Sequence, residues 1–301
     1  MRVPLKGPFS RAGKYGSRQP LGGYGYLDVA ELVAGNVDGK GGTDVYIVGR
    51  DLYQNTPARQ QPVFLHRSGT SWTSFADRPV HPLRVPDDGG GQTGPGLSVV
   101  GDFGKDGFGD LAVGRGLENT DRGRGSVIVH YGSADGRPKR MQTLSQDTAG
   151  VPGASENDGH FGSALDAGDV DGDGYADLAA GAYGEDAGRV RNTGMVTVLR
   201  GGPGGLTGKG ATAFDQSTAN VADTPEQDGA FGRTLKPADY TRDGRADLLV
   251  DVNEELDGKD RWGLVQILKG SPSGTTTSGA KHFTTDSLKL KYRTLGTYFA
   301  G

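Results

Sequence analysis

The sequence contains no cysteine among its 301 residues, which excludes a disulfide framework, a thiol nucleophile and a zinc–thiolate site. It has no apolar run near the ~20 residues of a membrane span. Residues 1–8 lack the apolar core of a secretory signal peptide. The formal net charge is only −4, so the basic surface typical of nucleic-acid binding is also missing. We expect neither a membrane span nor a nucleic-acid partner.

Catalytic motifs are equally scarce. There is no Gly-x-Ser-x-Gly elbow, no His-Glu-x-x-His and no phosphate-cradling Gly-Lys-Thr. The five histidines are scattered through the chain, at His66, His81, His130, His160 and His282. Packing explains those in or beside expected strands, and His160 is expected in a loop. These residues therefore predict no enzyme activity and no catalytic site.

Residues 169–177 form the most informative motif of the chain. Carboxylates occupy positions one, three, five and nine, glycine occupies position six, and the carbonyl of Tyr175 is available at position seven. Calcium takes six to eight oxygen ligands, and this alternation lets a short loop wrap around one ion. The alternative, a solvated acidic turn, explains the spacing less well. We predict calcium as the cofactor, with the ligands Asp169, Asp171, Asp173, Tyr175 and Asp177.

The same frame recurs at residues 36–44, 102–110 and 239–247, each beginning 66 to 70 residues after the previous one. Position six is always glycine, as expected where the backbone needs a positive φ. Position nine is always aspartate. The glycines are Gly41, Gly107, Gly174 and Gly244, and the aspartates are Asp44, Asp110, Asp177 and Asp247. A fixed period of this kind predicts a repeat array.

The four loops, called ion loops 1 to 4 in chain order, differ in their expected affinity. Ion loop 3 should bind best because it has four carboxylates. Ion loop 4 offers Asp239, Thr241, Asp243, Asp247 and the carbonyl of Arg245. Ion loop 2 offers Asp102, Asp106, Asp110 and the carbonyl of Phe108. In ion loop 1, the ammonium of Lys40 stands at position five, where it repels a cation. We expect Lys40 to take the place of the ion.

Position twelve, where an EF-hand needs a bidentate glutamate, is apolar in all four copies: Ile47, Val113, Ala180 and Val250. Each loop instead runs into an apolar β-prone stretch, which makes it a hairpin connection. Further strands are expected at residues 126–129, 195–198 and 264–267. Weaker fourth strands are expected at 72–75, 141–144, 212–214 and 282–284. Four antiparallel strands per unit, with no helical pattern, predict propeller blades.

These units resemble FG-GAP repeats, the blades of integrin α-subunit heads and of many secreted bacterial proteins. The resemblance is carried by Phe161-Gly162 before ion loop 3, by Gly181-Ala182-Tyr183 after it, and by Phe231-Gly232 before ion loop 4. Gly25-Tyr26 and Gly96-Leu97 stand in for the Phe-Gly pair in the first two units. It implies an all-β fold, a partial or small β-propeller of about four blades. The expected segments are an N-terminal flank 1–22, blades at 23–90, 91–155, 156–225 and 226–285, and a tail or closing strand 286–301.

Two functions follow from this resemblance. The first is a calcium-stabilised extracellular module for binding or adhesion, whose protein or glycan partner meets the loops opposite the ion loops. Those loops lie at residues 115–125, 184–194 and 253–263, with blade-to-blade links at 147–160 and 215–230. The second is a secreted hydrolase or lyase that cleaves polysaccharide or phospholipid. An incomplete ring would also expose blade edges and favour self-association.

Overall fold

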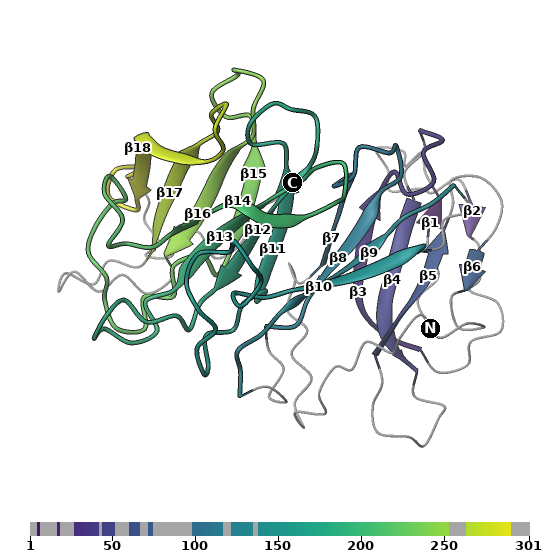
Figure 1. Cartoon of the computed structure of the whole chain (residues 1–301), viewed down its shortest axis with the longest axis horizontal. Coiled ribbons are helices and arrows are strands. Elements are labelled where there is room, and N and C mark those ends of the chain that lie inside the picture. Colours follow the sequence, from purple (N-terminus) through teal and green to yellow (C-terminus); the bar gives the residue numbers. More distant parts are fainter. Residues whose placement is uncertain are drawn as a thin grey trace.

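The computed structural model describes residues 5–6, 17–18, 27–41, 44–51, 60–66, 72–74, 98–116, 122–134, 138–252 and 263–289. These residues form four antiparallel four-stranded sheets and no helix (Figure 1). No described helix is long and apolar enough to cross a membrane. The all-β fold built from four-stranded blades, predicted from the repeat, is confirmed. The Gly25-Tyr26 and Gly96-Leu97 pairs and the loop at 253–262 lie outside the described residues.

Each sheet takes its four strands in chain order. The first has β3 (Leu27–Gly35), β4 (Asp44–Asp51), β5 (Gln60–His66) and β6 (Trp72–Ser74). The second has β7 (Ser98–Gly101), β8 (Asp110–Gly114), β9 (Val127–Tyr131) and β10 (Arg140–Leu144). The third has β11 (Ala164–Gly168), β12 (Asp177–Ala182), β13 (Met195–Arg200) and β14 (Thr207–Phe214). The fourth has β15 (Leu235–Ala238), β16 (Asp247–Val252), β17 (Leu264–Lys269) and β18 (Thr276–Thr284).

A separate two-stranded sheet pairs β1 (Leu5–Lys6) with β2 (Ser17–Arg18), which the sequence did not predict. The first strands of the four large sheets, β3, β7, β11 and β15, are neighbours in that order. The sheets therefore stack through their inner strands, as blades do around a propeller axis. Figure 1 shows them following one another along the chain, from purple to yellow.

The four ion loops close their hairpins in one register. The aspartate at position nine pairs with the residue just before position one, as in Gly101↔Asp110, Gly168↔Asp177 and Ala238↔Asp247. The position-six glycines all have positive φ, from 78° at Gly41 to 88° at Gly174. A side chain at that backbone angle is strained, which is why glycine recurs there. The hairpin role predicted for the loops is confirmed.

The described apolar core forms three clusters between neighbouring sheets, and the Phe-Gly pairs contribute to two of them. Phe161 and Phe231 are fully buried, the first in the cluster between the second and third sheets and the second in that between the third and fourth. Gly162 has φ 82°, and a Cβ there would lie 2.6 Å from the carbonyl oxygen of Ser126. The pair thus combines an apolar anchor with a close approach between backbones that only glycine allows.

The outer strands are longer than the sequence predicted. β14 begins at Thr207 rather than at residue 212, and β18 begins at Thr276 rather than at 282. Both contain a register shift, between Val198 and Arg200 and between Ile267 and Lys269 on the paired strands. These segments are polar or half-exposed and have no clear alternation. Main-chain pairing to the neighbouring strand, rather than side-chain burial, extends them.

Candidate functional site: the ion-loop row and the opposite loop face

The ion loops of successive blades are joined by a repeated backbone hydrogen bond. The N–H at position eight of one loop donates to the carbonyl at position one of the preceding loop. The bonds are Gly109 N to Asn36 O at 3.0 Å, Ala176 N to Asp102 O at 3.1 Å and Ala246 N to Asp169 O at 2.8 Å. The four loops therefore form a continuous row at one end of the blades, and we call this the ion-loop row.

Within ion loops 2 to 4, the aspartates at positions one and five fold the turn. The carboxylate of Asp169 accepts the N–H groups of Gly172 at 2.7 Å and Gly174 at 2.8 Å. Asp173 accepts the N–H of Tyr175 at 2.9 Å. In ion loops 2 and 4, Asp102 and Asp239 accept the N–H groups of positions five and six, and Asp106 and Asp243 accept that of position seven. These hydrogen bonds hold each loop in its turn conformation.

The aspartate at position nine ties its loop to the third strand of the same blade. One oxygen accepts an N–H near the start of the loop. The other accepts the N–H of the glycine that follows the third strand. The second set of bonds is Asp110 to Gly132 at 2.8 Å, Asp177 to Gly201 at 2.9 Å and Asp247 to Gly270 at 3.0 Å. Burial raises the pKa of Asp110 and of Asp177 to about 6, although these hydrogen bonds oppose the rise.

Ion loop 3 gathers a cation-binding set of oxygens. Ligand atoms of Asp169, Asp171 and Asp177 all lie within 4.8 Å of one another, and this is the one acidic cluster of that kind among the described residues. The guanidinium of Arg200 pairs with Asp171, and its Nη1 lies 3.3 Å from Asp177. The guanidinium thus pairs with two of the four carboxylates predicted as calcium ligands, Asp171 and Asp177, and Asp173 is not part of the cluster. The donor set, all hard oxygens, fits calcium.

Arg200 was not predicted from the sequence. It stands at the end of β13, 23 residues after Asp177, and directly precedes the glycine that binds Asp177. The equivalent positions before Gly132 and Gly270 carry Tyr131 and Lys269. The repeat gave no signal for this contact, because the Tyr131 hydroxyl bonds to Gln142 and to the N–H of Leu206 instead. The positive charge of Arg200 gives ion loop 3 an internal cation.

The other ion loops show weaker or different cation contacts. In ion loop 4, Arg245 Nη2 lies 2.9 Å from Asp243, so this side chain competes within its own loop. From ion loop 2, Lys105 Nζ reaches the carbonyl of Asp173 in ion loop 3 at 2.6 Å. In ion loop 1, Lys40 Nζ lies 3.2 Å from Asp38, as its position in the loop predicted. Thr241 contributes its N–H to Asp247 at 2.8 Å.

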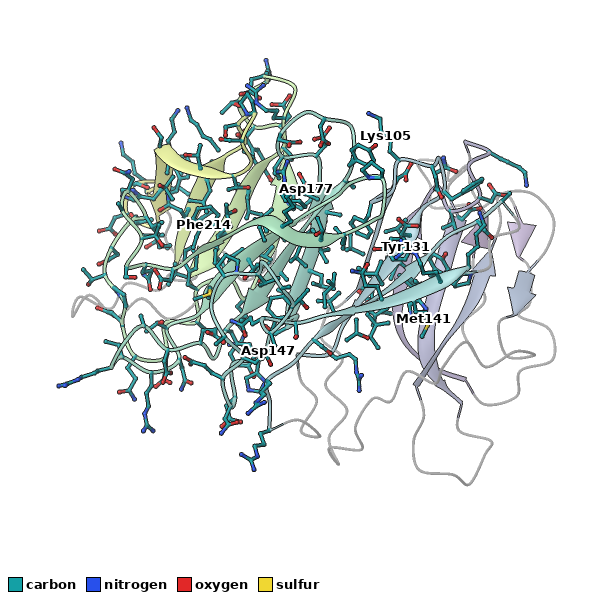
Figure 2. The ribbon with its side chains drawn as sticks, in the orientation of Figure 1. Lys105, Tyr131, Met141, Asp147, Asp177 and Phe214 are labelled. Carbon is teal, nitrogen blue, oxygen red and sulfur yellow. The ribbon has the colours of Figure 1, made fainter. Side chains whose placement is uncertain are left out.

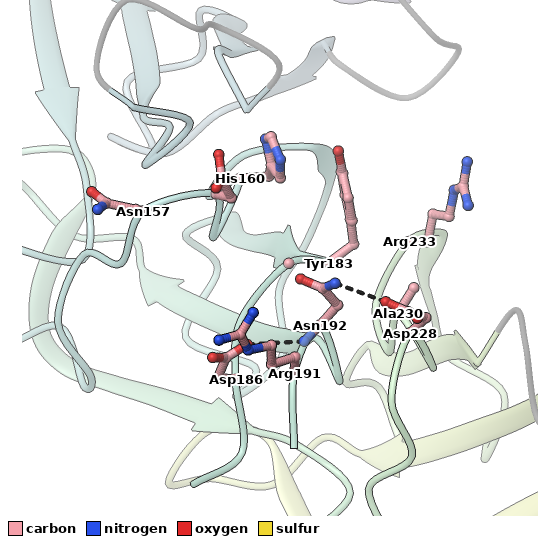
Figure 3. Close-up of a pocket in the computed structure, with 11 residues that line it drawn as sticks. Asn157, His160, Tyr183, Asp186, Arg191, Asn192, Asp228, Ala230 and Arg233 are labelled. Atoms are coloured by element: carbon pink, nitrogen blue, oxygen red, sulfur yellow. Dashed lines mark hydrogen bonds between the residues drawn. The ribbon is translucent and has the colours of Figure 1, made fainter. Parts of the chain in front are cut away.

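At the opposite end of the blades, loops from the third blade and its two neighbours meet around a pocket of about 580 Å³ (Figure 3). We call this end the loop face. Backbone bonds hold it: Asp158 N–H donates to Arg122 O at 2.8 Å, and Asp228 N–H donates to Arg191 O at 3.1 Å. The lining residues are Asn157, Asp158, His160, Tyr183, Gly184, Asp186, Arg191, Asn192, Asp228, Ala230 and Arg233. The sequence placed variable loops at this end but did not predict a pocket.

Two rings form one wall of the pocket. His160 stacks on Tyr183, with the ring centroids 4.5 Å apart and the planes inclined by 12°. The Nδ1 of His160 lies 2.6 Å from the carbonyl oxygen of Gly116, so Nδ1 carries the proton and donates it. Arg233 lies on the other side of Tyr183, its Cζ 5.9 Å from the ring centroid. The histidine expected to be a plain loop residue is therefore a fixed part of this wall.

Comparison with known proteins assigns one of the repeats to a family. Residues 161–199 match the family model described as the FG-GAP repeat. Integrin alpha-PS2 of Drosophila melanogaster is 39% identical over 100 residues, 32% of this chain and 7% of that protein. The phosphatidylinositol-glycan-specific phospholipase D of Rattus norvegicus is 31% identical over 173 residues, 57% of this chain and 20% of that protein. The chain thus spans a fifth or less of these relatives.

Among solved structures, the Bacillus licheniformis rhamnogalacturonan lyase PL11 aligns with 83% of this chain and 50% of its own. The TM-score is 0.43 and the sequence identity is 12%. A likeness of that size carries no argument about activity.

Proposed function

We propose that this chain, which is an FG-GAP repeat protein, is a calcium-stabilised extracellular binding module. The ion-loop row would hold calcium and stiffen one end of the blades, and the loop face would receive a protein or glycan partner. The observation that carries the proposal is the structural difference between the two ends of the blades. One end repeats a hydrogen-bonded acidic loop in every blade, and the other gathers unlike polar side chains around a pocket.

Calcium would be held mainly by ion loop 3, through Asp169, Asp171, Asp173, Asp177 and the carbonyl of Tyr175. When bound, the ion would supply charge compensation and a cross-link between the two strands of the hairpin. This role suits a chain with no disulfides. Weak calcium loops, with dissociation constants on the order of 10⁻⁴ to 10⁻³ M, are useful where the ion is plentiful, which favours an extracellular location.

The proposal is tested by melting the chain in excess calcium and in chelator, and by measuring partner capture on protein and glycan arrays. Calcium should raise the melting temperature. Removing the charges of Arg189 and Arg191 together, on the loop face, should reduce capture and leave the calcium-dependent shift unchanged. Coincident melting curves would mean that the loops are not structural ion sites.

A secreted hydrolase or lyase is the second candidate, and one buried group favours it. Glu185 is 3% exposed and does not line the pocket itself, but its two neighbours in the chain, Gly184 and Asp186, do. Burial raises its pKa to about 7, and a carboxyl tuned in this way beside a pocket is a candidate general acid. Turnover of a polysaccharide, phospholipid or ester that is lost in Glu185→Gln, with folding intact, would favour this candidate over the binding module.

A further inference from the structure

The pocket on the loop face is built from side chains that the repeat does not require. Its backbone recurs in the next blade, since Asp158 and Asp228, at equivalent positions, have φ of 60° and 63°. The aspartate recurs, but other side chains do not: the position of His160 is taken by Ala230 in the next blade, and that of Arg233 by Ser163 in the blade before. Blade packing therefore explains the loop backbone but not the polar and aromatic groups that it carries.

These groups place hydrogen-bond donors and acceptors side by side. Asn192 Nδ2 donates to Asp228 Oδ1 at 2.7 Å, and the N–H of Asn192 donates to Asp186 Oδ1 at 2.9 Å. Arg191 and Arg233 are exposed, and neither has an ion pair with another described residue. The lining thus has three aspartates and two arginines at close quarters. A simple anion would meet the carboxylates, and a simple cation would meet the guanidinium groups.

A sugar hydroxyl fits this lining better, because each hydroxyl both donates and accepts a hydrogen bond. Vicinal hydroxyls bridge a carboxylate and an adjacent amide or guanidinium without leaving either unpaired. Tyr183 adds an apolar ring surface for the C–H face of a sugar, and His160 keeps that ring from turning. The volume, about 580 Å³, lies in the range of small-ligand sites.

We propose that this pocket binds one pyranose unit of a glycan, with Tyr183 as the ring platform and with Asn192, Asp228 and the two arginines on the hydroxyls. The inference rests on the proposed binding function and narrows its partner from protein or glycan to glycan. Arg233 would move from its place over Tyr183 as the sugar ring enters. It is exposed and makes no ion pair with the described residues, so this movement breaks no strong contact.

In the test, the whole chain is titrated in the presence of calcium with defined trisaccharides of galactose, glucose, mannose, N-acetylglucosamine and galacturonic acid. Binding is measured by isothermal calorimetry. At least one trisaccharide should bind saturably. Tyr183→Ala should weaken that binding about tenfold or more, the effect of losing one good contact. Asn192→Asp, which keeps the side-chain shape but replaces the donor with a second carboxylate beside Asp228, should do the same. Tyr183→Phe should retain binding, because the ring remains.

The matched control is Tyr240→Ala, which removes an exposed tyrosine at the ion-loop end and should leave the affinity unchanged. Each variant is also melted with and without calcium. The inference is overturned if no trisaccharide binds, or if Tyr183→Ala and Tyr240→Ala bind equally well. If calcium still raises the melting temperature in that case, the glycan inference is wrong but the proposed calcium-stabilised module is not contradicted. If the shift is absent from the unaltered chain, the proposed function itself fails.

Discussion

At the scale of single residues, Arg200 is the most consequential side chain of the ion-loop row. It brings a guanidinium to Asp171 and Asp177, the same oxygens that a calcium ion would use. An internal cation lowers the repulsion among the carboxylates when no ion is bound. The guanidinium also competes with an entering calcium ion for these oxygens. Ion loop 3 would therefore have both the largest set of carboxylate ligands and a side-chain cation that opposes ion binding.

We expect Arg200→Met to make the chain more dependent on calcium. In chelator, unfolding free energy should fall by about 2 kcal/mol, because the carboxylates lose their partner. In calcium this loss should be largely restored, and the apparent calcium affinity should rise. Calorimetric melting with calcium and with chelator measures both effects. Lys269→Met, at the equivalent position of the next blade, is the control. A calcium-dependent shift no larger than that of the unaltered chain would contradict the role given to Arg200.

A second residue of consequence is Asp251, whose carboxyl group is buried inside the fourth blade. It is 1% exposed, one oxygen accepts the N–H of Thr234, and the other has no hydrogen-bond partner among the described residues. Burial raises its pKa to about 7 from an ordinary value of 3.8. The folded chain therefore keeps this proton over a range in which the unfolded chain has lost it.

This pKa shift predicts that stability falls as the pH rises from about 4 to about 7, as far as Asp251 contributes. Asp251→Asn should remove that contribution and make the chain more stable at pH 8 than the original, by at most about 4 kcal/mol. Urea unfolding at pH 5 and at pH 8 provides the comparison, with the difference between the two chains taken at each pH. If the two chains differ in unfolding free energy by the same amount at pH 5 and at pH 8, Asp251 does not titrate in this range.

At the scale of elements, the ion loops are one structure rather than four separate ones. Ion loops 2 to 4 are each bonded to the preceding loop through position eight and to their own third strand through position nine. An ion held in one loop therefore orders the turn of the neighbouring blade as well. The loops nevertheless differ in charge, from three clustered carboxylates in ion loop 3 to the Lys40–Asp38 pair in ion loop 1.

Position three allows a direct comparison of these two loops. Asp171→Ala should remove most of the calcium-dependent melting shift, whereas Asp38→Ala should leave it nearly intact, because Lys40 already compensates the charge there. The melting temperature of each variant is measured at increasing calcium concentrations, up to a value on the order of 10⁻³ M. Equal losses of the shift would show that ion loop 1 binds calcium as well as ion loop 3 does.

At the scale of the whole molecule, the described sheets are neighbours in chain order through β3, β7, β11 and β15. Their buried clusters lie between the sheets, as the labelled core side chains Tyr131 and Phe214 illustrate in Figure 2. On the first sheet, Val33 is buried toward the second, and Leu32, which alternates with it, is 63% exposed. The first sheet has a sheet neighbour on one side only among the described elements, so its other side is open to contact with another surface.

We therefore predict that the purified chain associates with itself through the outward face of the first sheet. Sedimentation should show a mass that rises with concentration, and Leu32→Glu should shift the chain toward the monomer by placing a charge in the contact. Leu288→Glu, at an exposed leucine after β18, tests the other end in the same way. A compact monomer at all concentrations would overturn the prediction.

The sequence by itself determined the repeat, the strands that follow each loop, the hairpin role of the loops and the all-β class. These features are local: glycine at position six, aspartate at position nine and the apolar run after it act within one unit and return at a nearly fixed period. Tertiary structure alone decided which groups meet from different elements. Arg200 reaches Asp171 and Asp177 across a blade, and His160, Tyr183 and Arg233 converge from three loops. Such contacts depend on how strands are paired and loops are folded in space, and spacing along the chain does not encode that distance.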